Sequence, residues 1–269
     1  MKSLRKFHPI AALVIGLAVL FAGPSADAKA KIRVVYNTEP NHPFITGKGT
    51  KIDAERPGLT IDLLHEVSRQ IGIEFEFKRV PWRRALFMVE AGQADAVFHS
   101  SFKTERTTFG AYPVKNGMPD ETRKIADFSY HIYTTKKYGV SWDGKVIGNA
   151  RRPIGVMRGA AMFDILKNAG HKVDDAISSA VNLRKLVGGR ICAYVDLEGV
   201  VDPNLSAHPE WLEIVQKLSP PIRTQPYFLM FSKAFADSQP ELTERVWDAI
   251  GDFRKSPQFE TLKKKYGLL

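Results

Sequence analysis

The segment from residue 58 to residue 106 constrains the fold most strongly, because helical and strand patterns alternate along it. Apolar side chains between residues 60 and 71 fall on one helical face, and Thr60 is the expected N-cap of this helix. Gly72 supplies a left-handed stop. Residues 73–78 then alternate apolar and charged side chains, which is the period of a half-buried strand.

A second helix and a buried strand complete this segment. Residues 83–91 are helical in pattern, and the short apolar run 94–98 is typical of a buried strand. With the apolar strand 32–36 before them, these elements predict a β-α-β-α-β unit with a parallel sheet. The polar run 100–106 follows the last strand, at the carboxyl edge where open α/β sheets hold small ligands.

Four short motifs in this region resemble those of a known family. They are a Pro-Phe turn after the first strand, the run Gly-Leu-Thr-Ile-Asp-Leu-Leu, an aromatic residue after the second strand, and Thr-Glu-Arg after the third, at residues 43–44, 58–64, 82 and 104–106. Their order and spacing resemble the type II periplasmic solute-binding proteins of extracellular family 3, which serve polar amino-acid uptake. The resemblance extends from about residue 31 to residue 267.

The rest of the chain repeats the same organisation. A second α/β unit, a return strand and an amphipathic closing helix are indicated by the patterns at residues 153–157, 161–169, 182–188, 191–195, 225–231 and 241–253. We therefore expect an α/β protein of the two-lobed type II periplasmic binding protein fold. Each lobe is then a mixed sheet flanked by helices.

The resemblance also implies how the lobes are connected. In the family the chain crosses between lobes twice, at positions that correspond here to residues 133–135 and 225–227. This predicts a first lobe from residues 29–133 and 229–269 and a second lobe from residues 134–228. Two crossings make a hinge, and the ligand is expected in the cleft between the lobes.

Residues 1–28 have the three parts of a secretory signal peptide. Basic residues precede an apolar run at 10–22, and Ala-Asp-Ala at 26–28 is a small-residue cleavage site. A membrane anchor is the alternative, but the run is shorter than the ~20 residues that span a bilayer. We expect cleavage after Ala28, a periplasmic location, no stable membrane insertion afterwards, and a monomer.

Composition excludes several classes of function. Cys192 lies in a buried-strand pattern, and the histidines lack the spacing of metal ligands, so neither a metal nor a cofactor is predicted. Without residues 1–28 the chain retains 36 basic and 28 acidic residues, a formal charge of +8. The basic residues are interspersed with acidic ones, so nucleic acid is not an expected partner.

A dipolar amino acid requires a counter-charge for each of its ends in a cleft that excludes water. The resemblance aligns Arg106 with the arginine that binds the ligand carboxylate, Ser101 with an assisting hydroxyl, and Asp196 with the acid that binds the α-ammonium. Trp82 is expected to form a flat wall. A solvated arginine, a helix-capping aspartate and a packing tryptophan are the alternative interpretations.

The turn Arg158-Gly159-Ala160 opens a predicted helix whose free amides suit an anion, so Arg158 and Ala160 join the predicted ligand-binding residues.

The chain also departs from the family. Where the family usually has an aromatic residue just before Pro-Phe, this chain has Pro40-Asn41-His42. Residues 115–126 form an insertion that makes the register of the cleft rim ambiguous.

The leading hypothesis is a binding protein and not an enzyme. It captures a small polar solute, expected to be an amino acid, and delivers it to an ABC transporter permease by hinge closure. One alternative is a cyclohexadienyl or arogenate dehydratase-like enzyme, in which Glu39, His42 or His99 serves as acid or base. Another is a sensory accessory module. No nucleophile elbow, zinc-binding helix or phosphate loop is present.

Overall fold

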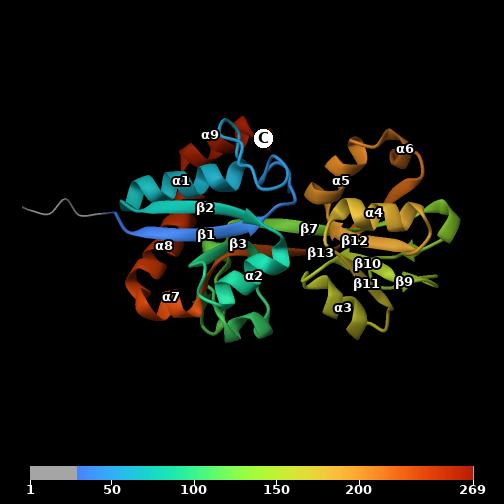
Figure 1. Cartoon of the computed structure of the whole chain (residues 1–269), viewed down its shortest axis with the longest axis horizontal. Helices are drawn as coiled ribbons and strands as arrows, with labels where there is room; N and C mark the ends of the chain where they lie inside the picture. Colours follow the sequence, from blue (N-terminus) through green and yellow to red (C-terminus); the bar gives the residue numbers. More distant parts are fainter. Residues whose placement is uncertain (1–28, 269) are drawn as a thin grey trace, which may run out of the picture.

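The computed structural model describes residues 29–268, so the predicted signal peptide lies outside the described residues. Two α/β lobes stand side by side and are joined by long strands (Figure 1). The strands are β1 Lys31–Asn37, β2 Glu74–Val80, β3 Ala96–Ser101, β4 Gly110–Ala111, β5 Val114–Lys115, β6 Met118–Pro119, β7 Ala126–Thr135, β8 Ser141–Trp142, β9 Ile147–Gly148, β10 Ile154–Met157, β11 Val173–Ala176, β12 Ala193–Leu197 and β13 Val215–Ser232. The α-helices are α1 Leu59–Ile71, α2 Trp82–Glu90, α3 Met162–Asn168, α4 Ser179–Val187, α5 Glu198–Ser206, α6 Pro209–Leu212, α7 Lys233–Ser238, α8 Pro240–Phe253 and α9 Pro257–Lys265, with 3-10 turns at Thr104–Thr108, Glu121–Arg123 and Lys136–Tyr138.

A nine-stranded mixed sheet runs through both lobes in the order β11-β10-β12-β7-β13-β3-β1-β2, with β4 paired to β13. Within each lobe the strands of the β-α-β units are parallel. The antiparallel pair β7 and β13 connects the lobes, since β7 also pairs with β12 and β13 also pairs with β3. The predicted two-lobed fold is confirmed.

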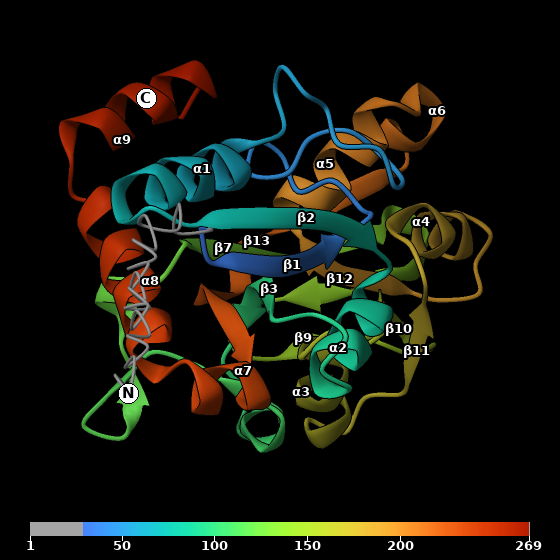
Figure 2. The ribbon, with the colours of Figure 1, turned by 60° about the vertical axis from the view of Figure 1, so that its left-hand side comes forward.

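The first lobe contains the predicted β-α-β-α-β unit. Helix α1 covers one face of β1 and β2, and α2 lies on the other face (Figure 2). Helix α1 ends at Gly72 in the left-handed conformation, as the sequence predicts. The apolar faces of the helices pack on the buried strands, and this burial is the main stabilising contribution to the lobe.

The predicted N-cap of α1 is wrong. The helix begins two residues earlier, at Leu59, and its N-cap is Gly58, with φ 113°. A side chain at residue 58 would collide with the carbonyl oxygen of Phe44, so only glycine fits this close approach. The Thr60 hydroxyl lies instead inside the helix and is hydrogen-bonded to Nε2 of His99 at 2.8 Å.

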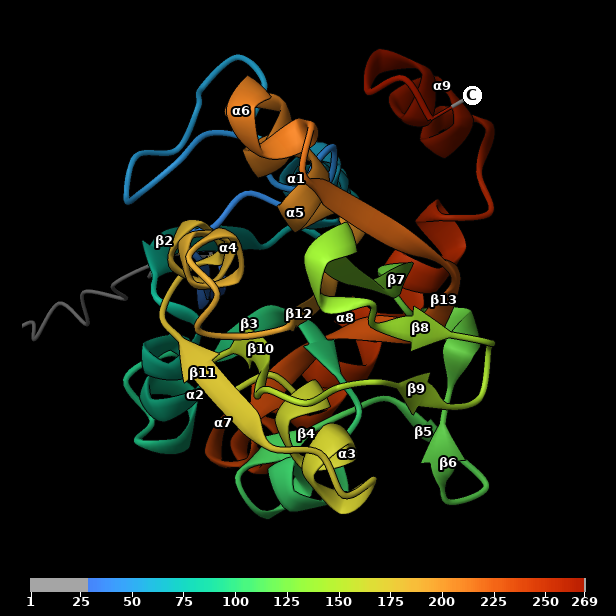
Figure 3. The ribbon, with the colours of Figure 1, turned by 90° about the vertical axis from the view of Figure 1, so that its right-hand side faces the viewer.

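The second lobe repeats the arrangement on a shorter sheet. Helices α4 and α5 lie on one face of β10 and β12, and α3 lies on the other (Figure 3). In both lobes the parallel strands point their carboxyl ends toward the boundary between the lobes. The two lobes therefore present the same kind of sheet edge to a shared cleft.

Strand β13 is much longer than the sequence predicts. It spans 18 residues, of which only the apolar part at 225–231 has a strand pattern. Its first half has no regular alternation of polar and apolar side chains and is largely exposed to solvent, and it is ordered by pairing with β7. The predicted lobe boundaries at residues 133/134 and 228/229 fall on these two connecting strands and stay a prediction. The insertion at 115–126 contains part of a β5–β6 hairpin and a 3-10 turn.

Within residues 29–268, no helix has the length and apolar character needed to cross a membrane. The same residues contain no cluster of three or more potential metal-ligating side chains. Cys192 is a buried free thiol next to the core of the second lobe.

Candidate ligand-binding site

A cavity of about 70 Å³ lies between the two lobes. Its walls include the carboxyl ends of strands from both lobes: Asn37 and Ser101 come from the first, and Met157 and Asp196 from the second. Such an edge is where open α/β sheets bind ligands. The polar run after β3 therefore lies where the sequence predicts.

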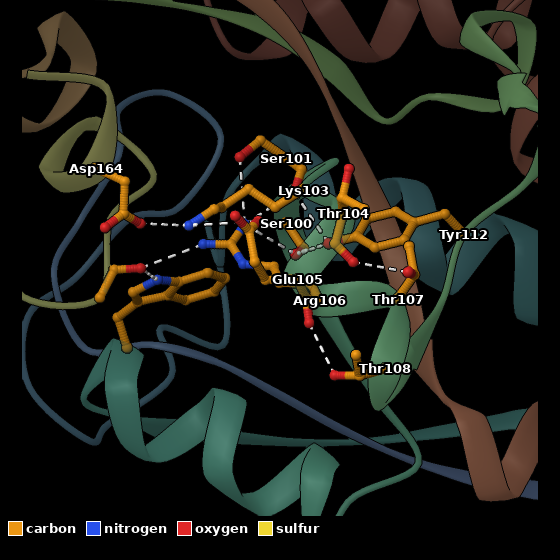
Figure 4. A network of polar contacts seen from close by, with 12 residues as sticks. Ser100, Ser101, Lys103, Thr104, Glu105, Arg106, Thr107, Thr108, Tyr112 and Asp164 are labelled. Carbon is orange, nitrogen blue, oxygen red and sulfur yellow. Dashed lines mark hydrogen bonds and ion pairs between the residues drawn. The ribbon is translucent and has the colours of Figure 1, made fainter. Parts of the chain in front are cut away.

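Arg106 provides a buried positive charge in this cavity. The residue is 5% exposed. Nη1 donates to the carbonyl and hydroxyl oxygens of Ser101 at 2.8 and 3.2 Å, and Nη2 donates to the Gly159 carbonyl at 3.2 Å (Figure 4). No carboxylate within residues 29–268 forms an ion pair with Arg106, and its Nε–H has no acceptor there. A buried guanidinium without an acidic partner is well placed to bind an anion.

Trp82 forms a wall beside this guanidinium. The Arg106 guanidinium carbon lies 5.5 Å from the centre of the Trp82 ring, in cation–π geometry. The indole N–H donates to the Gly159 carbonyl at 3.2 Å, so Trp82 and Arg106 of the first lobe share one acceptor on the second. Trp82 begins helix α2 directly after the strand, close to its predicted place at the strand tip.

A hydrogen-bond network fixes the serine residues to which Arg106 donates. The Tyr112 hydroxyl donates to the Ser101 carbonyl at 2.9 Å and lies 2.7 Å from the Ser100 hydroxyl. Since the Tyr112 proton is used in the first bond, Ser100 donates in the second. Burial raises the pKa of Tyr112, so it stays a neutral donor. Sequence reasoning missed Tyr112, which lies just before the insertion of ambiguous register, and it assigned no individual role to Ser100.

Asp196 provides a negative charge from the second lobe. It is 4% exposed and lines the same cavity. The Tyr194 hydroxyl donates a short hydrogen bond to Oδ2, and the Leu197 N–H donates to Oδ1 at 2.8 Å. Burial raises the pKa of Asp196 to about 6, with a further increase from nearby Glu39, although these two hydrogen bonds oppose the shift. A cationic ligand would therefore stabilise the ionised form of Asp196.

Further polar residues line the cavity that sequence reasoning did not assign to ligand binding. Glu39 and Asn41 come from the loop after β1, and His99 comes from β3. His99 has φ 58°, and burial lowers its pKa to about 3, so the ring is neutral. No periodic pattern in the sequence marks positions 37, 39 and 41, because residue 38 between them is also polar, but all three residues reach the cavity.

Of the two residues predicted to form an anion site, Arg158 and Ala160, only one lies at the cavity. Ala160 lines it, but Arg158 does not, because its guanidinium pairs with Asp175 at 2.9 Å. The Arg158 amide donates to the Ala176 carbonyl, and the Ala160 amide donates to the Met157 carbonyl. Both amides therefore already have acceptors, and the role of Arg158 is not supported by this geometry.

Several contacts hold the lobes together around the cavity. Lys103 of the first lobe pairs with Asp164 of the second at 2.6 Å (Figure 4). The His42 N–H donates to the Gly199 carbonyl at 2.8 Å. These contacts close the cleft. An outer groove of about 350 Å³ adjoins the cavity at Arg106 and Ala160, which line both.

Comparison with known proteins agrees with this geometry. Residues 33–112 match the family model described as bacterial extracellular solute-binding proteins, family 3. No curated protein sequence gives a significant match. The fold is that of the two-lobed periplasmic binding proteins. The predicted resemblance to family 3 is confirmed over the matched residues.

Similar solved structures include a histidine kinase sensor domain with similarity to periplasmic binding proteins, 16% identical, covering 88% of this chain and 96% of that one, with a TM-score of 0.69. The arginine-, lysine-, histidine-binding protein ArtJ from Geobacillus stearothermophilus is 17% identical and covers 89% and 95%, with a TM-score of 0.67. The ancestral amino acid-binding protein AncCDT-1, a precursor of cyclohexadienyl dehydratase, is 17% identical and covers 88% and 95%, with a TM-score of 0.62. At these identities the similarity shows the fold alone.

Proposed function

We propose that this chain is a periplasmic solute-binding protein that captures a small amino acid between its lobes and delivers it to an ABC transporter permease. The observation that carries the proposal is that Arg106 and Asp196 line the same cavity. Arg106 has no acidic partner of its own within the described chain, and Asp196 comes from the opposite lobe. The opposite poles of one dipolar solute match these two charges.

Closure follows from the placement of these groups on different lobes. A solute in contact with both lobes makes its full set of interactions only when the lobes meet, so binding favours the closed population. The connecting strands β7 and β13 are the natural place for the hinge. A permease that distinguishes closed from open protein would then recognise the loaded form.

The size of the cavity favours a short solute. The cavity measures about 70 Å³, much less than the outer groove of about 350 Å³ beside it. An amino acid with a short side chain is of this size. A longer side chain would extend toward the outer groove and push the lobes apart.

Calorimetry with a panel of amino acids tests the proposal. The best ligand is then compared with two analogues, one with the carboxylate converted to an amide and one with the amine acetylated. We expect each analogue to lose about 10-fold or more in affinity, because each leaves one buried charge without its partner. Analogues that bind as tightly as the parent amino acid would contradict the assignment.

Acidification is expected to weaken solute binding below about pH 6, where Asp196 becomes protonated. The ligand ammonium favours the carboxylate, so affinity is complete above the raised pKa and falls by up to about tenfold per pH unit below it. Calorimetry between pH 4.5 and pH 7.5 measures this effect. An affinity that does not change over this range would contradict the role of Asp196.

The stability of the free protein should respond in the opposite direction. Between the usual value of 3.8 and the folded value of about 6, folded Asp196 binds more protons than the unfolded chain. Its contribution to stability is therefore lost as the pH rises through this window and regained on acidification. Burial also raises the pKa of Glu39, so an Asp196→Asn variant is the control that separates the two carboxyls.

Catalysis is a second candidate function because Asp196 and Glu39 both have raised pKa values and both line the cavity between the lobes. Buried carboxyls with raised pKa values are candidates for general acids. A dehydratase-like reaction would convert prephenate or arogenate into an aromatic product. Prolonged incubation with either compound, followed by absorbance, distinguishes this function from reversible binding.

A further inference from the structure

The chain between β1 and α1 forms one wall of the cavity, although it contains neither a helix nor a strand of the main sheet. Its inner part supplies Glu39, Asn41 and Ile45 to the cavity. Residues 47–56 are mostly exposed, so little apolar burial holds them in place. We refer to residues 38–51 as the wall loop. Polar contacts must fix its shape.

Arg79, near the end of β2, provides these contacts from a buried position. The residue is 2% exposed. A guanidinium has five N–H donors, and in Arg79 all five are used. The acceptors are the backbone carbonyl oxygens of Asn37, Thr38, Thr46, Gly47 and Lys51, at distances between 2.9 and 3.4 Å. One side chain therefore connects the end of β1 with both limbs of the wall loop.

The charge of Arg79 is compensated by this loop and not by an ion pair. Within residues 29–268 no carboxylate pairs with its guanidinium, which lies 5.4 Å from the centre of the Tyr36 ring in cation–π geometry. Burial lowers the pKa of Arg79, but an arginine stays protonated in a protein. A buried charge is tolerated only when it is hydrogen-bonded, so any other shape of the wall loop would leave this charge without acceptors.

The wall loop also contacts the second lobe across the cleft. The Ser179 N–H donates to the Glu39 carboxylate at 3.4 Å, and the His42 N–H donates to the Gly199 carbonyl at 2.8 Å. Arg79 itself does not line the cavity. A loop without a fixed shape would have to be ordered when the lobes close on a solute, and this ordering would weaken binding.

We propose that Arg79 is a positioning residue of the binding site, which holds the wall loop in its bound shape before the solute arrives. The inference rests on the proposed function, because it assumes that a solute is bound between the lobes. A loop that is already ordered loses less conformational entropy on binding, so Arg79 raises the affinity without contacting the solute. An arginine with a purely structural role would stabilise the fold and leave the affinity unchanged.

Two variants test this role. Arg79→Met keeps an unbranched apolar chain and removes all five donors, whereas Arg79→Lys retains three donors on a single nitrogen. We expect Arg79→Met to lose about 10-fold or more in affinity for the tightest-binding amino acid, measured by calorimetry. Trypsin should cleave it after the exposed residues Lys48 and Lys51 at least about 10-fold faster than the wild type. Arg79→Lys should be intermediate in both measurements.

Arg254→Met is the matched control. Arg254 follows α8, is half-buried, and forms no ion pair within residues 29–268, but it lies outside the cavity and the wall loop. Its replacement should lower the melting temperature while the affinity and the cleavage after Lys48 and Lys51 stay within about twofold of wild type. A general loss of stability would change these two measurements in both Met variants.

Hydrogen exchange of the wild-type protein tests the same claim even if Arg79→Met does not fold. The Ile45 and Gly49 amides donate to carbonyls within the wall loop. In the solute-free protein we expect them to exchange at least about 10-fold more slowly than in an unstructured peptide. Faster exchange would show that the loop is not ordered before the solute binds, and would overturn the inference.

The remaining failures are distinguishable. A folded Arg79→Met that binds the solute as tightly as the wild type overturns the inference and leaves the proposed function standing. A loss of affinity without faster cleavage of the wall loop also overturns it, because Arg79 would then act by another route. If the wild type binds no amino acid at all, the proposed function fails and the inference fails with it.

Discussion

An Arg106→Ala variant is expected to lose at least about 30-fold in solute affinity, and up to several thousand-fold. Removal of one partner from a buried, hydrogen-bonded charge pair typically costs about 2–5 kcal/mol, because the other charge is left buried and unpaired. The guanidinium also contacts Trp82 and the Gly159 carbonyl, so closure itself should weaken. Calorimetry with the best ligand of the wild-type protein measures the loss.

Two further variants make this result specific. Arg106→Lys retains the charge but loses the planar pair of donors, and we expect an affinity between those of wild type and Arg106→Ala. Arg84→Ala removes an exposed cation from the same lobe and should bind normally. Wild-type affinity in a correctly folded Arg106→Ala would show that the carboxylate binds elsewhere.

A Gly199→Ala variant is expected to prevent full closure and to reduce affinity by about 10-fold or more, although residue 199 is outside the cavity. A methyl group there would lie 2.5 Å from the His42 carbonyl oxygen, which is rigid backbone of the first lobe, and would also collide with Asn41 Oδ1. The lobes would have to stay apart at this point. Ligand contacts that require closure would then be lost.

Thermal stability separates this effect from damage to the fold. Gly199 lies in the first turn of α5, and alanine in a helix is more favourable than glycine by roughly 0.5–1 kcal/mol. We therefore expect an unchanged or higher melting temperature together with weaker binding. Small-angle scattering should show a larger radius with saturating ligand than in the control Ser206→Ala, at the exposed end of the same helix. Equal radii and affinities would contradict the steric account.

The periodicity of the sequence predicts those helices and strands that are defined by an apolar face of their own. Helix α1, strand β2 and the closing helix α8 are found within one or two residues of their expected ranges because each has a complete apolar face. The helix start at Gly58 was missed because it depends on the distant Phe44 backbone. The length of β13 was missed because its polar half is ordered by pairing with β7 and not by burial.

Site residues could also be predicted only where a local sequence pattern marks them. Residues that directly follow a recognisable strand, such as Ser101 and Asp196, reach the cavity because strand ends point there. Arg158 also follows a strand, but Asp175 on the adjacent strand captures its side chain, and a linear pattern does not show this pairing. Glu39 and Asn41 lie on a loop without a periodic pattern, so only the folded chain shows that they face the cavity.

A crystal structure of the protein with its tightest-binding amino acid would test the central claim most directly. The account predicts one solute in the closed cleft, with its carboxylate on the Arg106 guanidinium and its α-ammonium within hydrogen-bond distance of Asp196. A solute held by one lobe alone, or bound away from either of these two residues, would contradict it.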